Sequence, residues 1–97
     1  MSFQLILTPQ AAKRYFELEN SPAKRNIFKQ VTKALEYLKN NPRHPSLNTH
    51  KHVSLTVQLG KETFEAYAQQ NTPGAYRIFF HYSGKKQITI IAITPHQ

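Results

Sequence analysis

The apolar residues of this chain repeat with one period in its first half and another in its second half, and this change limits the fold more than any other feature. From residue 9 to residue 40 they recur every three to four residues, the spacing of one helix face. Two pairs of Ser or Thr followed by Pro, at 8–9 and 21–22, supply helix starts. We therefore predict a helical hairpin with helices over residues 10–19 and 23–39. The side chains expected to pack it against the rest of the protein are Phe16, Ile27, Val31, Leu35 and Leu38.

The second half carries shorter apolar segments separated by turn residues, a pattern typical of strands. Residues 43–52 are rich in Pro, Ser and Asn and indicate a loop, whereas residues 53–59 alternate strictly between apolar and polar. Together with an opening strand, the pattern predicts one α+β domain over residues 1–97, in the order β-α-α-β-β-β-β. The helical hairpin would pack on one face of an antiparallel twisted sheet. The expected strands are residues 3–8, 53–59, 63–68, 74–82 and 87–93.

The chain is strongly basic and contains no cysteine. Its 13 Lys and Arg against five acidic residues give a formal net charge of +8. Such a protein attracts polyanions, so the expected partners are RNA, DNA or an acidic protein segment, and the alternative is a solvated basic surface without a partner. The apolar run near the N-terminus is too short for a signal peptide or a membrane span. We expect a cytoplasmic protein that does not enter a membrane.

The segment GAYRIFFHY, residues 74–82, places an arginine in the middle of an apolar strand. At a period of two, Arg77 lies on the same face as Phe79 and His81. A guanidinium can donate two parallel hydrogen bonds to a carboxylate or to a phosphate. Arg77 therefore faces either Glu65 on a neighbouring strand or an anion that the protein binds. His81 shares its face, and a half-buried packing role for this histidine is the alternative.

The order of the elements and the segment GAYRIFF resemble the RelE/ParE family of bacterial type II toxins, in which an aromatic-Arg-aliphatic strand follows a short glycine turn. The resemblance covers nearly the whole chain and implies the toxin of a toxin-antitoxin system, neutralised by an acidic antitoxin protein. RelE-like members cleave mRNA on the ribosome without a metal, and ParE-like members poison DNA gyrase. The implied function is thus a metal-independent, ribosome-dependent endoribonuclease without a cofactor. The alternatives are a gyrase inhibitor and an inactive toxin-like protein that only binds its antitoxin.

The resemblance also assigns residues to this chemistry. Cleavage of RNA by its own 2′-hydroxyl needs a base, an acid and donors for the charged phosphorane, roles that suit histidine and arginine. By position, Arg77 would stabilise the scissile phosphate, and His96 would act as acid or base. His81 is a third catalytic candidate. The candidate RNA-binding residues, which precede the strand after the helical hairpin, are His50, Lys51 and His52.

Each candidate has a structural alternative. His96 lies beside a chain end, where residues are often frayed, and residues 50–52 can belong to a surface loop without a task. His50 and His52 could ligate zinc together with His81 or His96, but no cysteine or acidic ligand accompanies them, so we expect no metal. Many relatives carry a second arginine on the strand before the glycine turn, where this chain has Tyr67.

Overall fold

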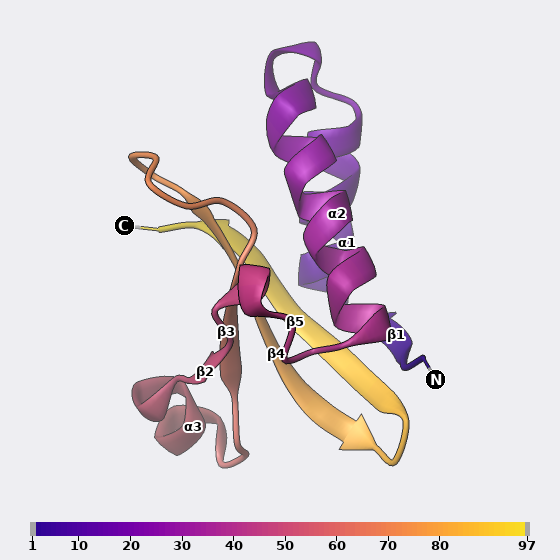
Figure 1. Cartoon of the computed structure of the whole chain (residues 1–97), viewed down its shortest axis with the longest axis vertical. Helices are drawn as coiled ribbons and strands as arrows, with labels where there is room; N and C mark the ends of the chain where they lie inside the picture. Colours follow the sequence, from indigo (N-terminus) through magenta and orange to yellow (C-terminus); the bar gives the residue numbers. More distant parts are fainter. Residues whose placement is uncertain (1, 97) are drawn as a thin grey trace.

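Five strands form one mixed sheet in the order β1-β5-β4-β3-β2, in a computed structural model that describes residues 2–96. The α+β class is confirmed. The sheet is antiparallel from β2 to β5, but β1 runs parallel to β5, which differs from the antiparallel sheet that the sequence predicted (Figure 1). The strands are β1 (Gln4–Leu7), β2 (His50–Lys51), β3 (Phe64–Tyr67), β4 (Tyr76–Gly84) and β5 (Gln87–Pro95).

The two predicted helices are present as a hairpin, α1 (Pro9–Glu19) and α2 (Arg25–Asn40). Thr8 caps α1, since its hydroxyl accepts a hydrogen bond from the Ala11 amide at 3.2 Å. The second Pro signal begins a short 3₁₀ turn, η1 (Pro22–Lys24), and α2 follows directly. Across residues 2–96, no helix combines the length and the apolar character that crossing a membrane requires.

The hydrophobic core lies between this hairpin and one face of the sheet. Val31, Leu35 and Leu38 are buried as predicted, and Ile27 is half-buried against the core. Phe16 was predicted to pack here, but it is 65% exposed. Ala11 and Leu18 are buried instead. The side of α1 that packs on β5 is therefore rotated by one residue from the side that the sequence pattern predicted. The sheet contributes Ala66, Tyr76, Ile78, Phe80, Ile88, Ile90 and Ile93.

Residues 53–59, predicted as a strand, instead form the helix α3 (Val53–Leu59). Two caps explain the difference: His52 Nδ1 accepts a hydrogen bond from the Leu55 amide at 3.2 Å, and Gly60 ends the helix in the left-handed region at φ +71°. No facing strand buries the alternating apolar residues, and Val53 and Val57 stay exposed. The strand that does precede β3 is the two-residue β2, within the predicted loop.

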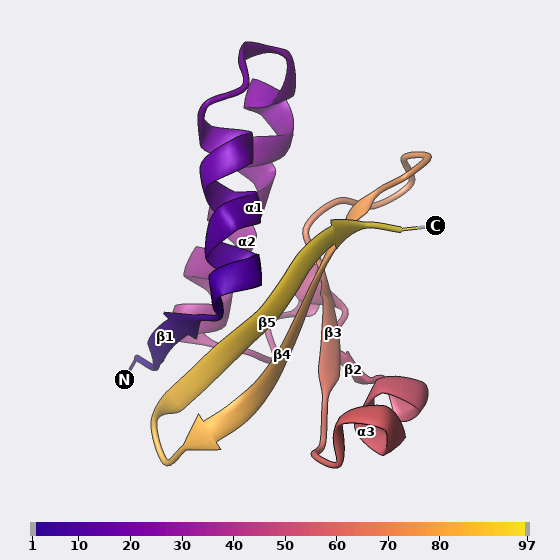
Figure 2. The ribbon, with the colours of Figure 1, turned by 180° about the vertical axis from the view of Figure 1, so that it is seen from behind.

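The second face of the sheet remains largely open. Its side chains include Arg77, Phe79 and His81 of β4, because alternate residues of β4 are buried against the helical hairpin. The helix α3 lies over the lower part of this face: the His52 ring contacts Phe79, and Leu59 lines a small hollow together with His81. Seen from behind, α3 lies beside the lower ends of β2 and β3, away from α1 and α2 (Figure 2). The upper part of the open face is therefore where residues from several strands can meet a ligand.

Candidate functional site

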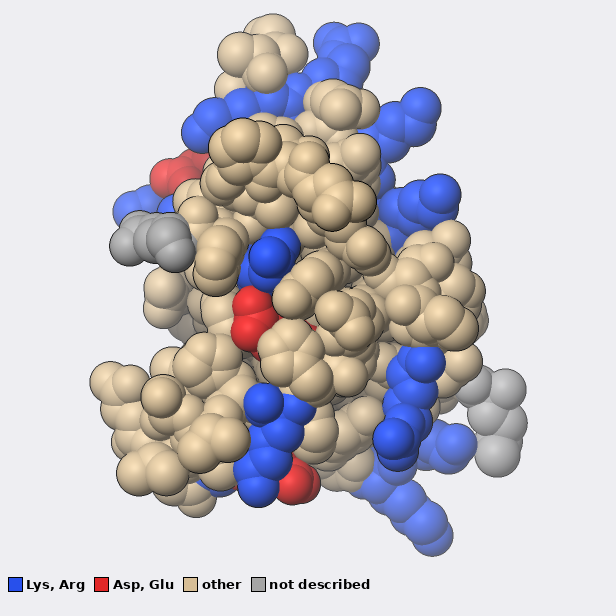
Figure 3. Space-filling view, turned by 60° about the vertical axis from the view of Figure 1, so that its left-hand side comes forward, with Lys and Arg blue, Asp and Glu red and all other residues tan. Residues whose placement is uncertain are grey.

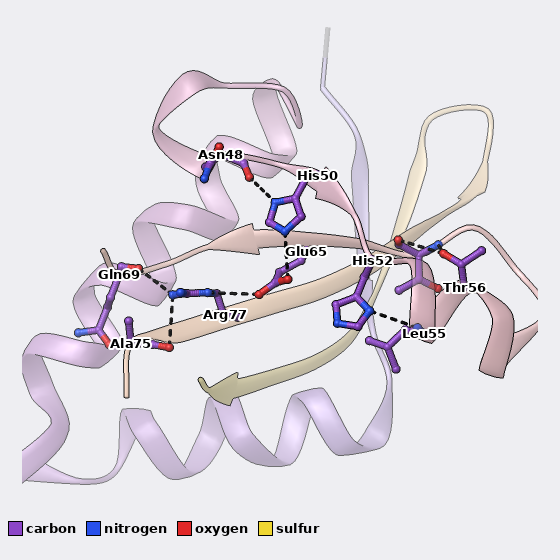
Figure 4. Close-up of polar contacts among 10 residues, drawn as sticks. Asn48, His50, His52, Leu55, Thr56, Glu65, Gln69, Ala75 and Arg77 are labelled. Atoms are coloured by element: carbon purple, nitrogen blue, oxygen red, sulfur yellow. Dashed lines mark hydrogen bonds and ion pairs between the residues drawn. The ribbon is translucent and has the colours of Figure 1, made fainter. Parts of the chain in front are cut away.

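Arg77 lies on the upper part of the open face, where its position is fixed by neighbours on both sides. Its guanidinium carbon is 3.8 Å from the centre of the Tyr67 ring, the residue directly opposite on β3. Nη1 donates to the carbonyl oxygens of Gln69 at 3.1 Å and Ala75 at 3.5 Å (Figure 4). The sequence predicted the face of Arg77 correctly.

Glu65 joins Arg77 to a histidine. Its Oε2 lies 3.2 Å from Arg77 Nε, and its Oε1 lies 3.2 Å from His50 Nε2. The pairing of Arg77 with a carboxylate of its own protein, one of the two alternatives left by the sequence, is therefore present. The Arg77 and Glu65 side chains are only 12% and 11% exposed, so water screens this pair less than it screens a surface salt bridge. We call His50, Glu65, Tyr67 and Arg77 the strand-face cluster.

The His50 ring is held through both of its nitrogen atoms. Nδ1 lies 2.9 Å from the carbonyl oxygen of Asn48, which can only accept, and Nε2 faces a carboxylate oxygen of Glu65. The ring also meets Tyr67 edge-on, with ring centres 5.8 Å apart. These contacts fix the position of the His50 ring beside the Glu65 carboxylate.

The Arg77 guanidinium is not fully used by these contacts. Nε approaches Glu65 without the alignment of a hydrogen bond and is buried, so this contact is an ion pair rather than a directed bond. Nη2 makes no hydrogen bond within residues 2–96, and it is not among their buried unpaired atoms. A ligand that reaches Nη2 would find both of its protons available.

His96 and Arg77 both donate a hydrogen bond to one backbone carbonyl. Its amide donates to the Ala75 carbonyl at 2.8 Å, the same oxygen that accepts from Arg77 Nη1. The side chain follows β5 at its upper end and is exposed. His96 therefore lies just beyond the beginning of the Arg77 strand.

Two other histidines do not belong to this cluster. His81 is four residues along β4 from Arg77, about 13 Å at the usual rise of a strand, and lines the lower hollow with Leu59, Lys61 and Ile91. The predicted grouping of His81 with Arg77 is therefore wrong in space, although the two share a face. His52 caps α3 and packs against Phe79, so its ring already has a structural role.

Lys51 lies on β2 next to His50 and is half-exposed. Its Nζ is 3.6 Å from the Glu62 carboxylate, a surface pair. Figure 3 shows basic side chains gathered around the rim of one side of the molecule, while the centre is mainly uncharged apart from one basic and one acidic group that meet in a hollow. An extended anion on this side would meet cations along its edges. Among residues 2–96, no group of three or more histidines and acidic residues could hold a metal ion.

Sequence reasoning missed Tyr67 as a site residue and treated Glu65 only as a structural partner. Both alternate along β3 on the Arg77 side, and the register pairs Tyr67 with Arg77 and Glu65 with Phe79. The period-two pattern of FEAYA could have placed Glu65 and Tyr67 on one face. It could not give the register against β4, which depends on the length of the connection between the strands.

No family model and no curated protein matches this sequence. Solved structures do match over nearly the whole chain. A YoeB/ParE toxin from Agrobacterium tumefaciens aligns with a TM-score of 0.74 at 12% sequence identity, covering 97% of this chain and 99% of that one. A YoeB dimer from Staphylococcus aureus aligns with a TM-score of 0.67 at 14% identity, covering 98% of each chain. The chain therefore has the fold of YoeB/ParE toxins, as the resemblance predicted.

Proposed function

We propose that this protein is the toxin of a bacterial type II toxin-antitoxin system and that it cleaves mRNA on the ribosome without a metal ion. The observation that carries the proposal is the Arg77–Glu65 ion pair on the open face, with the His96 backbone beside it. Glu65 binds Arg77 directly, and His96 shares the Ala75 carbonyl with it. A carboxylate, a guanidinium and an imidazole are the groups that phosphodiester cleavage by an internal hydroxyl requires.

In the proposed reaction, the RNA supplies its own nucleophile. Glu65 accepts the proton of the 2′-hydroxyl as the 2′-oxygen forms a bond to phosphorus, while His50 holds the other carboxylate oxygen in place. Arg77 binds the phosphorane oxygens through Nη2. The bond between phosphorus and the 5′-oxygen then breaks, and that oxygen takes a proton from His96. The products are a 2′,3′-cyclic phosphate and a 5′-hydroxyl, and no electron acceptor or metal enters the balance.

Binding of the phosphate would rearrange the Arg77–Glu65 pair rather than add to it. The stack on Tyr67 and the two carbonyl contacts of Nη1 keep the guanidinium plane fixed when Glu65 moves. In this proposal the Arg77–Glu65 ion pair is the resting arrangement, and the bound phosphate separates the two side chains.

One observation favours a second function. Nε and Nη1 of Arg77 are already occupied within the protein, so the arginine can be wholly structural. The protein would then act only by binding, either to DNA gyrase, as a ParE-like inhibitor, or to its antitoxin. In each case we propose an acidic antitoxin as the neutralising partner, because the chain carries a net charge of +8.

The deciding experiment compares Arg77→Ala, His96→Ala and the control Arg25→Ala for growth inhibition and for cleavage of ribosome-bound mRNA. Arg25 is exposed at the start of α2, and its substitution by Ala removes the same charge as Arg77→Ala does. We expect Arg77→Ala to abolish growth inhibition, and His96→Ala to slow cleavage about 10²- to 10⁴-fold, the usual loss for a general acid or base. The control should behave as the parent.

Thermal unfolding separates the two functions. An Arg77→Ala protein that stays folded and loses cleavage supports the nuclease. If Arg77→Ala inhibits growth as strongly as the parent, or if the parent inhibits growth without cutting mRNA, the nuclease is rejected. The gyrase or binding-only function then takes its place.

A further inference from the structure

A second hollow lies on the helix side of the sheet, opposite to the face that carries the strand-face cluster, between the 3₁₀ turn η2 (Pro45–Leu47) and the strands β2 to β4. Its volume is about 440 Å³, within the range of about 300–1,000 Å³ found for small-molecule sites. Of the residues used in the proposed reaction, His50 alone lines this hollow. The side chains that matter here are Arg43, His44, His50, Lys51, Phe64 and Tyr82.

The floor of this hollow is aromatic. Tyr82 is 43% exposed, although it lies near the end of a strand whose alternate residues are core. Three rings hold it in place, with centres 5.5 Å away for Phe64, 5.8 Å for Phe80 and 6.1 Å for Phe3. The exposed part of this ring is a surface on which a planar group can stack.

The rim of the hollow is cationic. Arg43 and Lys51 carry fixed charges, and His44 and His50 add two imidazoles, while no carboxylate is among the lining residues. Glu62 stands outside and pairs with Lys51 at 3.6 Å, whereas Arg43 forms no salt bridge within residues 2–96. Burial raises the pKa of the Tyr82 phenol above its ordinary value of 10.0, while the nearby Arg43 charge lowers it and Glu62 raises it. The ring therefore stays neutral at pH 7 and does not repel an anion.

The hollow and the strand-face cluster share one residue. His50, on the edge strand β2, lines the hollow and also contacts Glu65 on the open face, so an anionic chain held at Arg77 would pass around the sheet edge at His50 to enter the hollow. We propose that the hollow is a nucleotide subsite for single-stranded RNA, in which one base stacks on Tyr82 and a neighbouring phosphate binds Arg43. The subsite rests on the proposed function: it would hold a nucleotide of the same RNA on the other side of the sheet from the one that is cut.

Stacking and charge together favour RNA over other polyanions. An acidic peptide would use the cations but would gain nothing from stacking on the exposed Tyr82 ring. A single-stranded RNA uses both, because every base has a flat surface and every linkage a negative charge. The chemistry of the floor is therefore what separates the two classes of ligand.

The test is the binding of a short 2′-O-methyl oligoribonucleotide, which lacks the free 2′-hydroxyl and is not cleaved, followed by fluorescence anisotropy over a range of salt. Tyr82→Leu removes the platform and should weaken binding at least about fivefold, the lower limit for loss of one stacked base. Tyr82→Phe keeps the ring and should bind as the parent does. Arg43→Gln should lower the slope of log K against log salt by about 0.7, the value for one phosphate of a single strand. Arg25→Gln is the charge-matched control outside the hollow and should leave the slope unchanged.

Each outcome decides one statement. If Tyr82→Leu binds RNA as tightly as Tyr82→Phe, or if a polyglutamate peptide displaces the RNA at equal charge concentration, the subsite is rejected. If the parent cleaves no ribosome-bound mRNA while Tyr82→Leu still weakens RNA binding, the nuclease is rejected and the subsite stands. If the parent cleaves mRNA and both hollow variants bind RNA normally, the nuclease stands without this subsite.

Discussion

At the scale of single residues, the site depends on one carboxylate that contacts two side chains. Glu65 Oε1 faces His50 and Oε2 faces Arg77, and each distance is 3.2 Å. The sequence identified Arg77 and His50 as candidates because guanidinium and imidazole suit phosphate chemistry. It could not show that they meet at Glu65, because a charged residue within a strand looks the same whether it faces solvent or a partner.

Replacing Glu65 by Gln tests this arrangement. The substitution keeps the shape but leaves Arg77 beside a neutral group, and the loss of a nearly buried partner should cost about 1–3 kcal/mol of unfolding free energy. Glu62→Gln is the matched control, because the Glu62–Lys51 pair is exposed and such pairs contribute about 0–1 kcal/mol. Urea denaturation measures both. Equal losses in the two variants would mean that the Arg77–Glu65 pair contributes no more than a surface pair.

At the scale of elements, the helical hairpin could be predicted from the sequence. The side of each helix that packs against the sheet could be predicted only in part. The helices α1 and α2 agree with residues 10–19 and 23–39, because the 3.6-residue period of α2 is strong and the Pro signals mark both starts. In α1, one short helix with few apolar residues allowed a stripe that included Phe16, which the structure leaves exposed. A short amphipathic pattern fixes the helix better than it fixes its rotation.

A pair of truncations measures that difference. Leu35→Ala should cost about 2–5 kcal/mol, since Leu35 lies in the core between α2 and the sheet. Phe16→Ala should change the unfolding free energy by no more than about 0.5 kcal/mol, as substitutions at exposed positions do. Denaturation of both variants under the same conditions gives the comparison. A large loss for Phe16→Ala would contradict the packing of α1 described here.

The helix α3 shows why alternation over seven residues is a weak predictor. Val53, Leu55, Val57 and Leu59 fit a strand, but the caps at His52 and Gly60 close a helix around the same residues. The alternation would have needed a buried face, and the β3 edge is instead occupied by the two residues of β2. Local hydrogen bonds to the backbone therefore decide the structure where packing provides little.

Substitution of Gly60 tests the role of this cap. Its φ of +71° disfavours any side chain, and an added Cβ would meet no atom within 4 Å, so the cost of Gly60→Ala is backbone strain alone, about 1–2 kcal/mol. Gly60→Asn should cost less, because Asn tolerates the left-handed region. Thermal unfolding of the two variants is the measurement. If Ala and Asn are equally tolerated, the left-handed cap does not stabilise α3.

At the scale of the whole molecule, the site is assembled by topology that short-range patterns do not contain. His50, Glu65, Arg77 and His96 come from β2, β3, β4 and the residue after β5, and they meet because these strands are neighbours in the sheet. The β4–β5 turn, which the sequence predicted, places His96 near Arg77. The β3 register and the short β2 were not predictable, since both depend on the hydrogen bonds of the folded sheet.

The net charge of +8 belongs to this scale as well, and it would make the strength of binding to the proposed antitoxin depend on salt. If an acidic antitoxin neutralises the protein, long-range attraction should give submicromolar affinity at low salt, and affinity should fall steeply as the Debye length shortens from about 10 Å at 0.1 M to about 3 Å at 1 M. The measurement is co-expression with the small acidic reading frame beside the gene, where one exists, followed by calorimetric titration of the purified pair at several salt concentrations. Growth should recover on co-expression, and Arg25→Ala should weaken the complex only slightly, because one charge among many contributes little. A pair that forms with equal affinity at 0.1 M and 1 M salt would contradict the electrostatic basis of the partnership, and a reading frame that fails to restore growth is not the antitoxin.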